Sequence, residues 1–533
     1  MGLILASSAE AQPQRAELWP YPHLVYRWLE RAYGRGVLAV RGEEAPPVAR
    51  AQLLERLLAV DTLRLGRRDR ALWRSWVREL RDEPAQEATL FKPGFCSTAL
   101  ERHLYTYRDE QTRFFLDLSL GAELMRASEG ARYMGPVSRL GGRVYGSVFG
   151  RVGFFLDARA IGYRPAELGR FDPVWSRTQN ASILEEGSYD VQAFINYHAT
   201  PVELELGRGR LLYGSEPESS LLWSDNPPYV PYLRLRLAYP RLQFHFLHAA
   251  LSERAIEVPL PEDPSRTGSL KRPRWLALHR VQSEPLPGWI WAFTEAVVYG
   301  NRGMELAYWV PLYPFLISED EFGFLDNVLW TLETRVRLKG GLLLHGTWLI
   351  DNLTFSGLFT DTLDNKHAFQ VGFRWYGPAG WEAGCSYTYV DPFVYSHPTP
   401  YNAYRERQWG IGHPAGPNAD SWRATLTRWL PGRGHLEFSI SHVRKGLNVL
   451  DAQGRLIRNV GGDLLEGSGS LSEGKKRFLV LSDLHRWLEL SLALRWEPWR
   501  AFVLWFRWER RHILEGNRIP ERTLWRLGLE VGR

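Results

Sequence analysis

The chain has 533 residues and carries a formal net charge of +6 at pH 7. No clustered basic run or nucleic-acid-binding motif accompanies this charge, so we expect no nucleic-acid partner. The two cysteines, Cys96 and Cys385, lie far apart in the sequence, which excludes a disulfide-dense fold and a cysteine-based zinc cluster. We expect both thiols to be unpaired.

Arginine and the aromatic residues are unusually frequent. Only seven of the 66 basic residues are lysines, and tryptophan is as frequent as tyrosine, with 23 of each. Arginine suits a polar interior or an acidic ligand because its guanidinium makes planar bidentate bonds to carboxylates, although a GC-rich genome explains the same bias. Amphipathic rings favour membrane interfaces and sugar-binding faces.

The first residues are typical of the end of a signal peptide. Residues 1–8 are apolar, and Ala9, Glu10 and Ala11 fit a small-residue cleavage site. The segment lacks a basic start and its apolar core is short, so we interpret residues 1–11 as a signal-peptide remnant. An ordinary N-terminus is the alternative.

Residues 12–84 form a helical region in our interpretation, with three short amphipathic helices. The first stripe ends before Gly34 and Gly36, the second helix opens at Pro46 and Pro47, and the third runs from about Asp69 to before Pro84. The three stripes consist of Leu24, Val25, Trp28, Leu29 and Ala32; Ala51, Leu54, Leu57 and Leu58; and Leu72, Trp73, Trp76, Val77 and Leu80. Such a region is a small bundle, a plug or a periplasmic cap.

From about residue 103 the period changes from helical spacing to two. Residues 113–124 alternate without a break, which is longer than the usual five or six residues of a soluble strand and is about the length that a tilted strand needs to cross a bilayer. We therefore expect one face of this strand to meet lipid and the other to meet a polar interior. The lipid-facing residues are Leu116, Leu118 and Leu120, and the interior residues are Asp117, Ser119 and Glu123.

Similar alternation recurs to the C-terminus, at residues 189–206, in a hairpin at 488–508 and at 523–531. The longest charge-free stretch, residues 306–318, is too short for a membrane-spanning helix and contains two prolines, so membrane insertion would require a closed barrel. At roughly two dozen residues per strand and connection, residues 103–533 hold about eighteen strands. The predicted fold is thus mainly β: a transmembrane antiparallel β-barrel after a short α-helical segment. A soluble sandwich alternates in the same way.

Several segments resemble, in order, the capsule assembly Wzi-type family of outer-membrane proteins. They are LGRGRLLYG (206–214), SLLWSDNPP (220–228), LHRV (278–281), EAVVYG (295–300) with Arg302, PLYPF (311–315), LDN (325–327), WLIDN (348–352) and GHPAGPNAD (412–420). Residues 21–80 are similar to the helical start of longer relatives. The resemblance implies a barrel of about eighteen strands in a Gram-negative outer membrane. It also implies a lectin-like role in attaching and assembling capsular polysaccharide, without enzymatic activity.

Catalytic motifs are absent from the sequence. It contains no His-Glu-x-x-His, Cys-x-x-Cys, Gly-x-Ser-x-Gly or phosphate-loop pattern, so we expect no catalytic residue, no cofactor and no metal. His279 with Glu295, or Asp326 with Asp351, would be the carboxylate or acid–base pairs of an enzyme. We interpret them as ordinary lumen-lining charges.

Gly207 and Gly209 begin like a dinucleotide fingerprint, but no helix follows, so we interpret them as a strand end. The intervening arginines, Arg208 and Arg210, are candidates to pair with Glu203 and Glu205 in the lumen.

One loop combines rings that stack on sugars with arginines that pair with uronate carboxylates. The predicted polysaccharide-binding residues are Tyr401, Tyr404, Arg405, Arg407, Trp409 and His413. The alternative is that they are interfacial aromatics and loop residues.

The predicted function is binding, anchoring or organising capsular or exopolysaccharide at the cell surface, by a monomer whose partners are an acidic surface polysaccharide and outer-membrane lipids. The alternatives are an outer-membrane porin or transport channel and a secreted β-rich carbohydrate-active enzyme.

Overall fold

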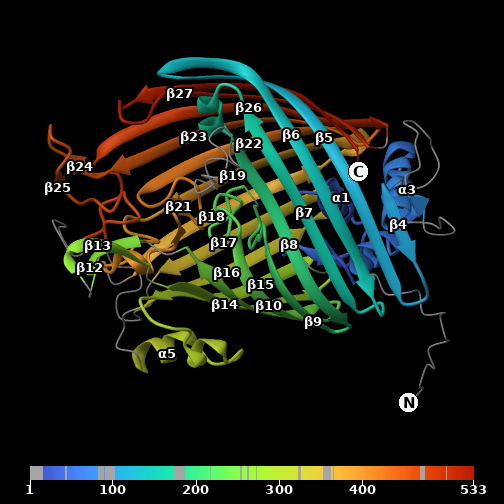
Figure 1. Ribbon diagram of the computed structural model, residues 1–533, viewed down its shortest axis with the longest axis horizontal. Coiled ribbons are helices and arrows are strands. Elements are labelled where there is room, and N and C mark those ends of the chain that lie inside the picture. The colour runs from blue at the N-terminus through green and yellow to red at the C-terminus, as the bar shows by residue number, and fades with distance from the viewer. Residues whose placement is uncertain are drawn as a thin grey trace.

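Eighteen strands close into one antiparallel barrel, as the sequence predicts (Figure 1). The computed structural model describes residues 16–41, 45–81, 89–90, 103–172, 187–216, 218–252, 255–260, 263–271, 273–321, 326–351, 362–363, 365–468, 475–499 and 501–532. The predicted signal-peptide remnant, residues 1–11, and Cys96 lie outside these residues. Cys385 is a free thiol, as expected. No helix among the described residues is long and apolar enough to cross a membrane.

Each barrel strand pairs with the next one along the ring, and β28 closes the ring by pairing with β5. The barrel strands are β5 (Thr112–Glu129), β6 (Ala131–Val148), β7 (Val152–Tyr163), β8 (Gly187–Ala199), β9 (Val202–Gly209), β10 (Val230–Ala238), β11 (Leu242–Leu251), β14 (Arg274–Leu286), β15 (Trp289–Gly300), β16 (Asn327–Arg337), β17 (Leu342–Asp351), β18 (Lys366–Tyr376), β19 (Trp381–Val390), β22 (Ala419–Leu430), β23 (Gly434–Leu447), β26 (Asp483–Trp499), β27 (Phe502–Glu515) and β28 (Arg522–Val531). β3 (Thr89–Leu90) and β4 (Tyr105–Arg108) extend the sheet beside the start of β5.

The faces of β5 are those that its alternation predicts. Leu118 and Leu120 are exposed on the outer surface, whereas Asp117 and Glu123 are buried inside the barrel. Arg139 of the neighbouring strand donates to Glu123 at 2.9 Å, so the inward charges are paired. This arrangement follows from the period-two geometry of a strand, which sends successive side chains to opposite faces of the sheet.

The two mouths of the barrel differ. At one mouth the strands are joined by short turns, residues 149–151, 200–201, 239–241, 287–288, 338–341, 377–380, 431–433 and 500–501. At the other mouth, six of the connections between barrel strands are long: residues 164–186, 210–229, 252–273, 301–326, 391–418 and 448–482. Exposed aromatic side chains ring the outer surface near both mouths, among them Trp289, Trp375, Trp381 and Trp496 at the short turns and Phe369, Trp422 and Trp525 nearer the long loops. In outer-membrane barrels short turns face the periplasm, and aromatic girdles mark the two interfaces.

The smaller elements lie in the helical region and in the connections. The helices are α1 (Leu24–Gly34), α2 (Arg50–Leu58), η1 (Thr62–Arg64), α3 (Arg67–Arg81), η2 (Ala166–Phe171), η3 (Leu306–Trp309), α5 (Phe315–Glu321), η4 (Lys339–Gly341), η6 (Pro378–Gly380) and η7 (Pro400–Asn402). The short strands pair as β1 (Leu18–Trp19) with β2 (Val48–Ala49), β12 (Ala255–Leu260) with β13 (Asp263–Lys271), β20 (Arg405–Glu406) with β21 (Trp409–Gly410), and β24 (Val449–Leu450) with β25 (Leu456–Arg458).

The helical region packs into the short-turn mouth, and Figure 1 shows α1 and α3 at the end of the barrel opposite β12–β13 and β24–β25. Its apolar side chains join one core with inward-facing rings of the wall, including Phe115 and Tyr145. Arginines tie it to the turns: Arg31 donates to Gly377 O at 2.8 Å and Arg433 donates to Glu79 at 2.7 Å. The three predicted stripes form α1, α2 and α3, although α2 begins only at Arg50 because the two preceding residues pair as β2.

Gly34, the last residue of α1, is required for a steric reason. A β-carbon at this position would lie 2.2 Å from the ring of Tyr376 on β18. Only glycine allows the end of α1 to approach the wall so closely.

Candidate functional site

The connection between β9 and β10 turns into the lumen instead of extending outward. Leu211, Leu221 and Leu222 are buried in the main core, and Tyr213 pairs with Trp223 in an isolated bridge. Ser224 Oγ donates to Gly412 O at 2.7 Å, which joins this inward loop (residues 210–216 and 218–229) to the connection between β19 and β22. The apolar base of the loop thus places its polar tip in the middle of the barrel.

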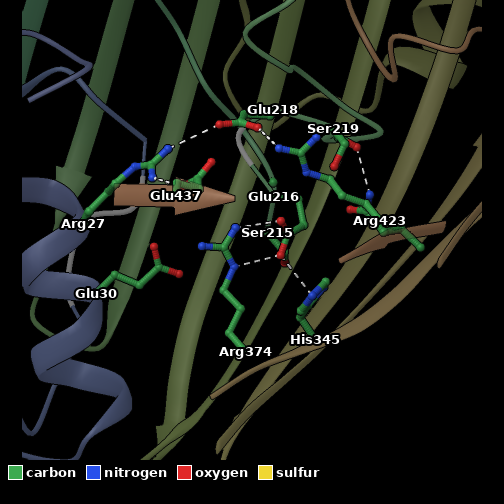
Figure 2. A network of polar contacts seen from close by, with 12 residues as sticks. Arg27, Glu30, Ser215, Glu216, Glu218, Ser219, His345, Arg374, Arg423 and Glu437 are labelled. Atoms are coloured by element: carbon green, nitrogen blue, oxygen red, sulfur yellow. Dashed lines mark hydrogen bonds and ion pairs between the residues drawn. The ribbon is translucent and has the colours of Figure 1, made fainter. Parts of the chain in front are cut away.

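The tip of the inward loop meets α1 and the wall in a network of ion pairs (Figure 2). Arg27 of α1 contacts Glu218 at 3.3 Å and Glu437 of β23 at 2.6 Å. Arg423 of β22 binds the second oxygen of Glu218. Glu218 therefore bridges the helical region to the wall across the lumen.

Glu216, at the same tip, makes a second set of contacts with the wall (Figure 2). Arg374 of β18 donates to it at 2.7 Å, and His345 Nε2 of β17 lies 3.1 Å away. Burial alone would raise the pKa of Glu216, but the guanidinium of Arg374 and the contact with His345 hold it well below its usual range. The carboxylate is thus ionised and fixed in place, and the network joins α1, the inward loop and the wall inside the barrel.

Two cavities lie on either side of this network. The smaller, of about 110 Å³, lies between α1, the inward loop and the wall around β18 and β22. The larger, of about 460 Å³, extends along β23, β26 and β27 and has Tyr21 and His23 at its base. Arg27, Glu218, Arg423 and Glu437 line both.

The larger cavity, which we call the arginine cavity, has a basic and hydroxyl-rich lining. Seven arginines and four glutamates line it, and Ser439 Oγ and Ser491 Oγ lie 2.8 Å apart on its wall. The side chain of Arg507 is 52% exposed although it contacts Glu509 at 2.5 Å, and Arg511 is 29% exposed beside Glu489 at 2.8 Å. Partly hydrated guanidiniums next to hydroxyls and aromatic rings can bind the carboxylates, hydroxyls and ring faces of acidic sugars.

The six predicted polysaccharide-binding residues gather in one lobe between β19 and β22, where β20 pairs with β21. Tyr404 is fully buried, donates to Leu222 O at 2.9 Å and stacks on Tyr395 with 5.7 Å between ring centroids. Arg405 is buried, and its guanidinium donates to Arg407 O. These two side chains therefore fix the lobe to itself and to the inward loop.

His413 is also buried in this lobe. Its Nδ1 accepts the backbone N–H of Ala415 at 3.2 Å, and its Nε2 lies 3.5 Å from Ser421 Oγ. Burial, with a smaller contribution from Lys445 and Arg423, lowers the pKa of His413 to about 3, so the ring is neutral. Among the predicted residues only Tyr401, Arg407 and Trp409 have partly exposed side chains, and their contact with a glycan stays a prediction.

Two pairings expected from sequence are wrong. Glu203 and Glu205 bind Arg236 and Arg234 of β10, because the antiparallel register places these residues directly opposite one another on the inner face. Arg210 lies beyond the end of β9 and contacts Asp225 instead, at 3.5 Å.

His279 and Glu295, considered above as lumen residues, lie opposite each other on the outer face of the wall. They share this face with exposed Phe293, and Phe315 N donates to Glu295 at 2.9 Å. Sequence reasoning also missed the arginine cavity. Its signal was the polar face of the hairpin at 488–508, where Glu489, Ser491 and Arg495 alternate with leucines.

The comparisons with known proteins support the fold. No protein-family model and no curated protein matches the sequence. Among solved structures, Wzi of Escherichia coli, described as an outer-membrane protein involved in group 1 capsule assembly and a carbohydrate-binding β-barrel, matches with a TM-score of 0.61 and 10% identity. The match covers 97% of this chain and 99% of that one.

Two Pseudomonas aeruginosa proteins also match. They are OccK3, with a TM-score of 0.42, 12% identity and coverage of 78% of this chain and 95% of that one, and OccD3, with a TM-score of 0.44, 12% identity and coverage of 78% and 91%. At these identities the likeness concerns the fold. The chain is a closed, eighteen-stranded antiparallel β-barrel with the fold of Wzi.

Proposed function

We propose that this barrel is a non-enzymatic protein that binds and organises an acidic capsular or exopolysaccharide at the cell surface. The arginine cavity carries the proposal, because it places partly exposed guanidiniums and serine hydroxyls side by side on one concave surface. The description of Wzi as a carbohydrate-binding barrel of capsule assembly supports the same role for a chain of this fold.

The interior of the barrel is more consistent with binding of a glycan than with transport of a solute. The helical region fills the short-turn mouth, and the tip of the inward loop is joined by Glu216 and Glu218 to α1 and to the wall at β18 and β22. A solute crossing the lumen would have to break the partly exposed ion pairs that Glu216 and Glu218 form with α1 and the wall. A repeating polymer needs only weak individual contacts, because many copies of the barrel bind it together.

The partly exposed residues of the lobe, Tyr401, Arg407 and Trp409, are the proposed contacts at the mouth with the long loops. Trp409 and Tyr401 would stack on sugar rings and Arg407 would pair with a uronate. The buried members of the lobe, Tyr404, Arg405 and His413, would hold these three in position.

The test is calorimetric binding of oligogalacturonate, a polymer of uronic acid, with neutral dextran oligosaccharides as the comparison. Replacing Arg507 or Arg511 by glutamine should weaken oligogalacturonate binding by about tenfold or more, since a charge-assisted hydrogen bond contributes about 1.5–3 kcal/mol. The control is Arg486→Gln, because Arg486 forms a similar ion pair with Glu515 at 3.0 Å on the same two strands but does not line the cavity. Unchanged affinity in both cavity variants, or equal binding of dextran, would contradict the proposal.

Conductance separates binding from transport. In planar bilayers the wild-type barrel should be nearly silent because its lumen is closed by the helical region and the inward loop. Large, steady currents from the wild type would favour the channel alternative instead.

A further inference from the structure

The outer wall of the barrel carries polar side chains on neighbouring strands. His248, His279 and Glu295 lie on β11, β14 and β15, on the same face as exposed, apolar Phe293 and Leu332. Polar groups on a lipid-facing wall are costly unless protein covers them. All three are buried, so something other than the wall shields them.

The shield is the described part of the connection after β15, residues 301–321, which we call the lateral strap. Figure 1 shows α5 outside the barrel, beside β14 and β15. Trp309 of the strap packs on His248 with 4.7 Å between ring centroids, and Phe315 packs on His279 at 4.0 Å. The strap thus lies against the outer surface and does not project from the mouth.

Polar contacts fix the inner face of the strap. Glu295 accepts the backbone N–H groups of Phe315 and Leu316 at 2.9 and 3.2 Å, and Trp330 Nε1 at 3.0 Å. Tyr308 is fully buried and donates to Asp326 at 2.6 Å. The strap is therefore held rigidly, and its outer face has a defined composition.

Between Met304 and Ile317 that outer face is apolar. Leu306 and Leu312 are 82% and 81% exposed. Three further apolar side chains are more than 45% exposed: Met304, Val310 and Ile317. Residues 306–318 contain no charge at all, which is unusual for a segment in contact with water.

The apolar outer face is continuous with the lipid-facing wall. Phe293 and Leu332 lie only two residues along their strands from Glu295, which accepts from the strap, and from Trp330, which packs against the cluster that contains Tyr308 and Phe315 of the strap. The ring of Phe293 contacts that of Trp330 edge to face, with 5.7 Å between centroids. The surface therefore passes from barrel wall to strap without an intervening polar belt on these two strands.

We propose that the lateral strap is a lipid-contacting element that inserts its outer apolar side chains among the acyl chains of the membrane leaflet next to the long loops. It widens the barrel's apolar surface on one side and replaces the aromatic girdle there, with its backbone near the boundary between headgroups and acyl chains. Lipid is the partner because the strap adjoins the wall that already faces lipid.

Site-directed spin labelling in liposomes tests the proposal. The background is the Cys96→Ser and Cys385→Ala protein, and the labelled variants are Leu306→Cys and Leu312→Cys. Leu332→Cys on the wall is the lipid reference, and Gln453→Cys in the exposed β24–β25 hairpin is the water reference. Retained β-sheet circular dichroism checks that each labelled barrel is folded.

If the strap contacts lipid, the labels at 306 and 312 should collide more with oxygen than with a water-soluble nickel chelate. The label at 332 should show the same preference, and the label at 453 should show the opposite one. Preference for the nickel chelate at both strap positions would overturn the proposal in favour of an aqueous loop. Low accessibility to both reagents, together with a cysteine-linked dimer at 306 or 312, would overturn it in favour of a second copy of the chain.

Discussion

Arg31 is the side chain whose loss should release the helical region from the barrel. It is 1% exposed and donates to Gly377 O at 2.8 Å, Trp381 O at 3.1 Å and Glu382 at 3.2 Å. Arg31→Met keeps the length of the side chain but removes these three contacts and the ion pair with Asp69 of α3 at 3.6 Å. Gly377 lies in the turn between β18 and β19, and Trp381 is the first residue of β19, so the change acts directly on the docking of α1.

The magnitude follows from the contacts. A hydrogen bond to a charged group contributes about 1.5–3 kcal/mol, and breaking a buried ion pair by removing one partner costs about 3–5 kcal/mol. Glu382 keeps one donor, Trp429 Nε1 at 2.6 Å, which limits the loss. We therefore expect docking to weaken by about 3–5 kcal/mol, which raises the population of the undocked state by roughly two to four orders of magnitude.

Hydrogen exchange of the α1 backbone amides measures this population, because these amides exchange when the helical region undocks. Exchange in α1 should accelerate by about a hundredfold or more, while exchange in the β26–β27 hairpin should not change. Arg64→Met is the matched control, since Arg64 is in the same region but is exposed and makes a single contact, to Gly36 O at 2.9 Å. Acceleration of less than tenfold, or an equal effect of Arg64→Met, would refute the reasoning.

Further predictions concern the inward loop and the lobe. Because the pKa of His413 is about 3 in the folded lobe and near 6.5 when exposed, the unfolded lobe takes up a proton first, and stability is lost as the pH falls from about 6.5 towards 3. The loss should be about 2–3 kcal/mol at pH 4.5 and should appear as faster proteolysis of the lobe. His413→Asn, which keeps an acceptor for Ala415 N, should remove this pH dependence, and an unchanged dependence would exclude His413 as its source. Tyr404→Ala should destabilise the lobe by about 3–5 kcal/mol and accelerate its proteolysis at neutral pH, whereas a wild-type rate would show that the buried ring is dispensable. Glu218→Gln should raise bilayer conductance, because it removes charge from the bridge between Arg27 and Arg423; continued silence would mean that the apolar base of the loop closes the lumen without it.

The sequence was sufficient for the fold because each part of it has a local signal. Period-two alternation assigned the faces of β5, since a strand must send successive side chains to opposite sides. Apolar stripes at helical spacing located α1, α2 and α3, since residues three and four apart lie on the same face of a helix. The length of the alternating region and the family resemblance each gave a barrel of about eighteen strands, as observed.

The interior could not be predicted in the same way, because its contacts join distant segments. Glu218 meets Arg27 across 191 residues and Arg423 across 205. The choice of Arg234 and Arg236 over Arg208 and Arg210 for the glutamates of β9 depends on strand register, which the alternation of a single strand leaves open. The inward loop was unrecognised because its leucines and Trp223 are compatible with any buried turn.

The position of the lateral strap, in contrast, can be inferred from the alternation of polar and apolar residues in the wall strands. His279 and Glu295 fall on the outward parity of their strands, where a lipid-facing barrel should have apolar residues. These two polar residues lie on neighbouring strands, and the connection that follows contains thirteen uncharged residues in a row. We expect this combination when a connection folds back over the outer wall of its own barrel. The buried face then supplies donors to the carboxylate, and the charge-free face is left for lipid. Breaks in an otherwise regular outward pattern therefore indicate where a barrel wall is covered by its own chain.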